Sequence, residues 1–289
     1  MNLRRVALFL LAPALLLPAV PRGTRAELVL PRVSPRAGMT QTVGTTDLAV
    51  SCSRPGVKGR AIWGGLVPFD KPWRTGANEA TTFATTTDIL VAGQKLAAGT
   101  YSFFTIPAAN EWTVIFSRQK DLWGAFDYDP GQDALRVTAT PDTTQPHQEW
   151  MWLGFDDLTP GSCNLVLRWQ RLRLAVPITV DVNANVLASC RAEVAAAKSD
   201  DWRTPYRAAG WCFDNSAGLD EGAAWLEKSL AVQPVHANLA LKARWQWKDG
   251  KKAEAIATAK KAVEAGKASK DKVDTSATEK LLADWSAQK

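Results

Sequence analysis

The sequence predicts an α+β protein of two domains, an antiparallel β-sandwich followed by a small all-α domain of repeated helical hairpins. Two observations lead to this prediction. Residues 34–182 contain eight or nine short segments that are rich in β-branched and aromatic residues and are bounded by Gly, Pro, Asn or Asp. From residue 183 the apolar residues recur at helical spacing, and matching positions repeat with a period of about 33.

Residues 1–26 are predicted to be a signal peptide. Two arginines precede the apolar run of residues 6–20, and the small residues Thr24 and Ala26 lie where a signal peptidase cleaves. The alternative is an uncleaved membrane anchor, but the run is short and two prolines interrupt it. We therefore expect a periplasmic or secreted protein that begins near Glu27 and has no membrane span after cleavage.

The net charge gives no support for a nucleic-acid partner. The chain has a formal charge of +6, and the predicted signal peptide holds four arginines and no acidic residue. Removing it lowers the formal charge to about +2, so the basic character belongs largely to the signal peptide. The lysines of the C-terminal region alternate with acidic residues, as on a solvated helix face.

The β-sandwich prediction rests on short strands without helical periodicity between them. Pro177 should lie near an edge or a bulge, because proline cannot donate a hydrogen bond to a neighbouring strand. The predicted strands are 45–53, 81–87, 89–91, 100–107, 111–117, 134–140, 149–155, 164–169 and 173–182.

The helical domain is predicted over residues 183–289. A first helix carries Val186, Cys190 and Val194 at four-residue spacing. Two hairpins follow, and small residues occupy matching places where paired helices would cross: Gly210 with Ala243, and Gly222 with Ala255. The hairpin helices are predicted at 205–214, 219–232, 237–248 and 253–264, with a last helix from Thr275 to about residue 288.

The second hairpin resembles a tetratricopeptide repeat. Its Lys-Asp-Gly turn at 248–250, followed by Ala-Glu-Ala-Ile at 253–256 and Lys-Ala-Val at 261–263, is similar to the second half of such a repeat. Lys242 and Gly266 depart from the usual Leu and Pro of the family. The resemblance implies a peptide or protein partner on the helical domain.

The β-rich part resembles an exported bacterial family called domain of unknown function 2911. The resemblance covers about residues 34–182 and implies a β-rich exported domain, sometimes followed by helical repeats. It brings no established activity and therefore no catalytic residues. The stretches that carry it are 53–60 (SRPGVKGR), 62–68 (IWGGLVP), 73–81 (WRTGANEAT), 98–102 (AGTYS), 111–116 (EWTVIF) and 123–128 (WGAFDY).

Residues 54–79 combine charged, amide and aromatic side chains with five glycines, which suits a loop that shapes a pocket. Such a set offers stacking faces and directional hydrogen bonds to a polar ligand, such as a glycan or a peptide. The alternative is that Arg74 and Glu79 pair with each other and tie the loop to the sheet. The candidate ligand-binding residues are Arg54, Trp63, Trp73, Arg74, Asn78 and Glu79.

Asp127, Asp129 and Asp133 alternate around a Pro-Gly pair, and such carboxylates can wrap a Ca²⁺ ion. The alternative is a simple Asp-Pro-Gly turn between strands. No other cofactor is predicted.

The chain has four cysteines, at positions 52, 163, 190 and 212. In an exported protein they could form two disulfides, with Cys190–Cys212 as the first candidate and Cys52–Cys163 as the second. Burial as free thiols is the alternative, because the chain is long enough to build a core without disulfides.

Catalytic motifs are incomplete in this sequence. It has only His147 and His236, which excludes a multi-histidine zinc site, and it lacks a nucleophile elbow or a phosphate-binding loop. We therefore expect an exported binding or scaffolding protein rather than an enzyme. The alternative is a hydrolase that acts on cell-envelope glycans through residues 54–79, with a carboxylate pair that includes Glu79.

Overall fold

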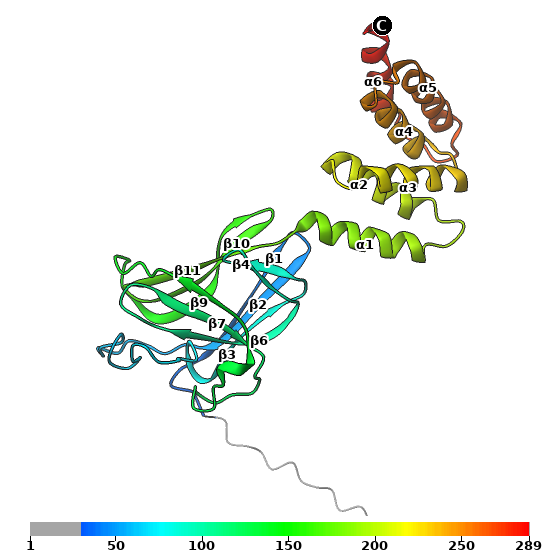
Figure 1. Cartoon of the computed structure of the whole chain (residues 1–289). Coiled ribbons are helices and arrows are strands. Elements are labelled where there is room, and N and C mark those ends of the chain that lie inside the picture. Colours follow the sequence, from blue (N-terminus) through cyan, green and yellow to red (C-terminus); the bar gives the residue numbers. More distant parts are fainter. Residues whose placement is uncertain (1–29, 289) are drawn as a thin grey trace, which may run out of the picture. The chain divides into compact units, whose positions relative to one another are not determined.

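The computed structural model describes residues 30–288 and confirms the α+β class: two antiparallel sheets come first, and six α-helices follow (Figure 1). The predicted signal peptide, residues 1–26, lies outside the described residues. No helix within residues 30–288 is long and apolar enough to cross a membrane.

The first sheet has six strands in the order β1-β2-β3-β6-β7-β8, and every neighbouring pair is antiparallel. Its central strands carry the β-branched and aromatic residues that favour a pleated, half-buried surface. The bounds are β1 Arg36–Val43, β2 Thr46–Ser53, β3 Ala77–Thr85, β6 Gly99–Ile106, β7 Trp112–Ser117 and β8 Asp133–Ala139.

The second sheet has five strands in the order β5-β4-β11-β10-β9. Pro177 lies within β11, an inner strand, next to the point where pairing with the short strand β4 stops. Pro177 pairs with Asn164, which borders a bulge in the pairing of β10 with β9, so it lies near a bulge as the sequence predicts. The bounds are β4 Ile89–Val91, β5 Gln94–Leu96, β9 Gln148–Thr159, β10 Ser162–Gln170 and β11 Leu172–Thr179.

The inward residues of both sheets belong to one buried apolar cluster. In β2, for example, Leu48, Val50 and Cys52 are buried in this cluster, while Ser51 and Ser53 alternate with them and face the other way. Burying each large apolar side chain of this kind contributes about 1.5–3 kcal/mol. The alternation therefore fixes which residues are left on the outer face of each sheet.

Four tryptophans gather within this core. Trp63, from the loop after β2, packs edge-on against Trp112 with ring centroids 4.9 Å apart. Trp73 stacks on Trp169 at 5.9 Å, so the loop between β2 and β3 is joined to strands of both sheets. Such aromatic pairs contribute about 0.5–1.5 kcal/mol beyond the burial of their area.

The six helices follow β11. α2 pairs with α3 and α4 pairs with α5, as the two predicted hairpins required, and the ring of Trp285 in α6 stacks on Trp247 of α4 at 4.6 Å. The tetratricopeptide-like character of these hairpins stays a prediction. The bounds are α1 Val182–Ala196, α2 Arg203–Asn215, α3 Leu219–Val232, α4 His236–Lys248, α5 Lys252–Ala268 and α6 Ser276–Ala287.

Candidate functional site

The outer face of the six-stranded sheet is partly covered by the loop of residues 118–129. Leu122, Ala125 and Tyr128 of this loop pack on Ala80 and Phe104, which point outward from β3 and β6. These contacts form a small second apolar cluster, distinct from the core between the sheets. The loop therefore has a fixed place on the sheet.

Beside this cluster the outer face carries a row of small polar residues. The strand register places Ser51 of β2 opposite Thr82 of β3, and Thr82 opposite Ser102 of β6. The row continues to Gly38 of β1 on one side and to Ser117 of β7 on the other. Because these side chains are short, they leave space on the sheet where longer residues would fill it.

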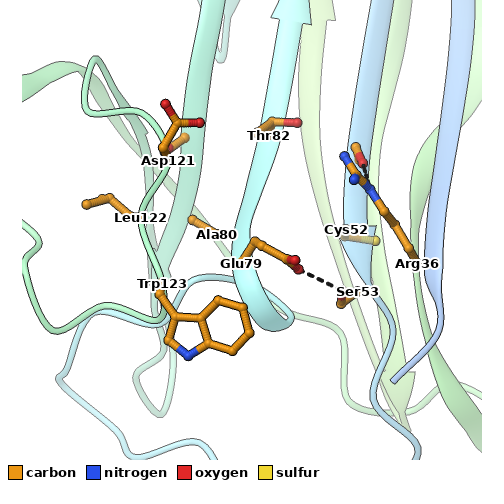
Figure 2. A pocket seen from close by; sticks show the side chains of 11 residues that line it. Arg36, Cys52, Ser53, Glu79, Ala80, Thr82, Asp121, Leu122 and Trp123 are labelled. Carbon is orange, nitrogen blue, oxygen red and sulfur yellow. Dashed lines mark hydrogen bonds between the residues drawn. The ribbon is translucent and has the colours of Figure 1, made fainter. Parts of the chain in front are cut away.

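A cavity of about 310 Å³ opens over this row. Its floor includes the hydroxyl groups of Ser51, Thr82 and Ser102. In Figure 2, Arg36 and Asp121 lie on opposite sides of the cavity, with Glu79 between them. The residues that line it are Arg36, Ser51, Cys52, Ser53, Glu79, Ala80, Thr82, Ser102, Asp121, Leu122 and Trp123.

Backbone pairing positions the loop beside the start of β3. The amide of Ala80 donates to the carbonyl of Leu122 at 2.9 Å, and the amide of Gly124 donates to the carbonyl of Asn78 at 3.2 Å. This pairing sets Trp123 next to Glu79 in a β-bridge. The Trp123 side chain is 60% exposed, so its ring is available at the cavity.

Two residues with left-handed backbone flank the cavity. Asn78, directly before Glu79, has φ +60°, and Asp121 has φ +57°. Asn and Asp are the non-glycine residues that adopt this conformation most readily. Such backbone is strained in a residue other than glycine and persists only where the surrounding structure holds it. Residues of this kind cluster at functional sites.

Of the six predicted ligand-binding residues, the structure places Glu79 in this cavity, where the hydroxyl of Ser53 donates to its carboxylate at 3.5 Å. Trp63 and Trp73 pack with each other and with Trp169 in the core. Arg54 donates from Nε to the carbonyl of Met151. The Asn78 amide donates to the carbonyl of Ser34 at 3.4 Å.

Arg74 does not pair with Glu79, so the predicted alternative of an ion pair between them is wrong. The Arg74 Nε is buried, and no hydrogen bond or ion pair joins its side chain to another residue within 30–288. Burial lowers the pKa of this guanidinium. Trp73 and Thr75, the neighbours on either side, are buried.

The predicted calcium loop is a turn. Asp129 accepts a hydrogen bond from the amide of Gly131 at 2.8 Å, and Asp133 accepts one from the Tyr128 hydroxyl at 2.7 Å and pairs with Arg136. Over residues 30–288 no three His, Cys, Asp or Glu residues are grouped to hold a metal ion. The structure therefore shows the Asp-Pro-Gly turn, and a calcium site at Asp127, Asp129 and Asp133 stays a prediction.

All four cysteines are free thiols, so the candidate disulfides Cys190–Cys212 and Cys52–Cys163 are not formed in the structure. Burial raises the pKa of Cys52, Cys163 and Cys212 to about 11 in each case, whereas Cys190 is only partly buried. A thiol with so high a pKa is a poor nucleophile at neutral pH.

Sequence reasoning missed Arg36, Asp121 and Trp123. Trp123 stands in one of the stretches that carry the family resemblance, but nothing in the sequence places that stretch beside β3. Arg36 belongs to a strand that was not predicted, and Asp121 belongs to a loop that was not assigned a role. The site is therefore made by strand register and by loop placement rather than by a local motif.

Comparison with known proteins gives a family for the β-rich part. Residues 34–178, which run through both sheets, match the family described as a protein of unknown function, DUF2911. Neither the curated proteins nor the solved structures give a match to the chain. The match covers half of the 289 residues and confirms the resemblance found in the sequence. The chain belongs to the DUF2911 family.

Proposed function

We propose that this chain is an exported binding protein whose β-rich part takes up a small polar ligand in the cavity lined by Glu79, Arg36 and Trp123. The observation that carries the proposal is the cavity of about 310 Å³ on the outer face of the six-stranded sheet. A site built on strands holds its residues more precisely than a site on free loops.

The chemistry of the lining suits a glycan or a short peptide. Hydroxyl groups of Ser51, Thr82 and Ser102 can donate and accept hydrogen bonds, and Arg36 and Glu79 add charged donors and acceptors. The exposed ring of Trp123 offers an apolar face on which a sugar or a side chain can stack. Ligand sites commonly combine an aromatic surface with a few directional polar groups.

The test is binding of glycan and peptide libraries to the full chain and to two variants, Trp123→Ala and Glu79→Gln. Each substitution should weaken binding about tenfold or more, which corresponds to a loss of about 1.4 kcal/mol. The matched control is Phe126→Ala, because Phe126 lies in the same loop, is 86% exposed and does not line the cavity. Equal affinities for all four proteins would exclude this cavity as the binding site.

One observation favours the alternative, a hydrolase acting on cell-envelope glycans: Glu79 and Asp121 line the same cavity. Glycoside hydrolysis uses two carboxyl groups, one as an acid and one as a base or nucleophile. If the chain is such an enzyme, Glu79→Gln abolishes turnover of a glycan that the variant still binds. A bound glycan that the wild-type chain leaves intact supports the binding protein.

The helical part fits a role in holding a partner chain. Cavities of about 460 Å³ lie between α1 and α2, beside Val186, Arg207 and Trp211, and between α3 and α4, beside Leu226 and Trp245. Export is proposed from the signal-peptide pattern of residues 1–26. Together these features support an envelope protein that links a small ligand to a second polypeptide.

A further inference from the structure

We infer that the ligand of the Glu79 cavity is dipolar, a molecule of amino-acid size with a carboxylate at one end and an ammonium group at the other. The inference rests on the proposed function and names its ligand class. It follows from the charges on the two walls of the cavity, which have opposite sign (Figure 2).

The wall formed by β1 carries a cation. The Nε of Arg36 donates to the hydroxyl of Ser51 at 3.1 Å, which fixes the direction of the guanidinium and leaves its terminal Nη groups for a ligand. No acidic side chain within residues 30–288 forms an ion pair with Arg36. A guanidinium held in this way matches a carboxylate, which it can bind through two parallel hydrogen bonds.

The opposite side of the cavity carries the carboxylate of Asp121, and the carboxylate of Glu79 lies between Asp121 and Arg36 (Figure 2). Asp121 lines the cavity and makes no ion pair with a Lys or Arg among residues 30–288. The exposed ring of Trp123 lies beside them, and the face of an indole attracts a cation. An ammonium group is therefore favoured at this wall.

The size of the cavity suits a small dipolar molecule, because its volume of about 310 Å³ is at the lower end for small-ligand sites. The serine and threonine hydroxyls of the floor can bind the remaining polar atoms.

The test measures binding of the twenty L-amino acids to the full chain by calorimetry, together with the N-acetyl and carboxamide derivative of each. We expect at least one free amino acid to bind, and both of its derivatives to bind at least tenfold more weakly. Arg36→Gln should remove the preference for the free carboxylate over the carboxamide. Asp121→Asn should reduce the preference for the free ammonium over the N-acetyl form.

Arg171→Gln is the matched control, since it removes an exposed arginine that does not line the cavity. Arg36→Met, which keeps the apolar stem and removes the charge, replaces Arg36→Gln if the melting curve shows that the latter does not fold. Neutral saccharides that bind in the cavity while Arg36→Gln has no effect would overturn the dipolar ligand and leave the proposed function standing. If neither amino acids nor glycans nor peptides bind, the proposed function fails as well.

Discussion

The side chain of Arg74 is a half-buried cation that has no hydrogen-bond partner or ion pair among residues 30–288. A buried donor left without a partner costs about 1–3 kcal/mol relative to one that is satisfied. Burial also lowers the pKa of this group, which is the expected consequence of removing a charge from water. The Arg74 side chain therefore adds no polar contact that would stabilise the fold of residues 30–288.

This argument gives a prediction for Arg74→Met. The substitution keeps most of the apolar stem and removes the unsatisfied nitrogen, so the free energy of unfolding should be unchanged or higher. Arg54→Met is the matched control in the same segment, because it leaves the carbonyl of Met151 without its Arg54 donor and should cost about 1–3 kcal/mol. Urea unfolding of the two variants measures the difference. A loss at Arg74 as large as the loss at Arg54 would show that Arg74 has a structural role.

The strands show how far the sequence determines the candidate site. All nine predicted strands are present, because alternating apolar residues and turn residues are local signals. β1 was missed because its sequence, RAGMTQTV, is mostly exposed and has little apolar content. Strand register depends on the partner strand, so the row Ser51–Thr82–Ser102 could not be foreseen, and the cavity depends on it.

The helices allow a sharper comparison, because two glycines lie inside them in different surroundings. A Cβ on Gly222 of α3 would lie 2.6 Å from the Cβ of Cys212 and 2.8 Å from the ring of Trp245. A Cβ on Gly210 of α2 would have its nearest neighbour, a methyl group of Leu241, at 3.8 Å, which is an ordinary contact. The small residue is therefore required at Gly222 and not at Gly210.

We predict opposite effects for alanine at the two positions. Gly210→Ala should stabilise the protein by up to about 1 kcal/mol, because alanine favours the helix and nothing has to move. Gly222→Ala should destabilise it by about 1–3 kcal/mol, since the helices must separate to admit the methyl group. Thermal and urea unfolding followed by the helical circular dichroism signal measure both changes. Stabilisation at both positions would mean that α2 and α3 pack less closely than the structure shows.

For the molecule as a whole, the open question is whether the β-rich part folds without the helices. The sequence predicts a boundary near residue 182, where the strand pattern gives way to helical spacing. The first turn of α1 nevertheless has contacts with the sheets: the Asn185 amide donates to the hydroxyls of Thr46 and Thr87, each at 3.2 Å. Val182 lies against Gly44, where a Cβ would come within 2.5 Å of its side chain.

These contacts predict that two fragments will differ in stability. Residues 34–188 keep the first turn of α1, whereas residues 34–181 lose Val182 and Asn185 and leave the hydroxyls of Thr46 and Thr87 without a donor from the helix. Both fragments should give a β-type circular dichroism spectrum, because each keeps all the buried residues of the cluster shared by the two sheets, the last of which is Val180. The shorter fragment should unfold at lower urea concentration, because the lost contacts lower its free energy of unfolding by about 1–3 kcal/mol.

A control fragment, residues 34–188 with Asn185→Ala, separates the effect of the hydrogen bonds from that of the packing of Val182. If neither fragment melts cooperatively while the full chain does, the helices belong to the same folding unit as the sheets and the boundary is wrong.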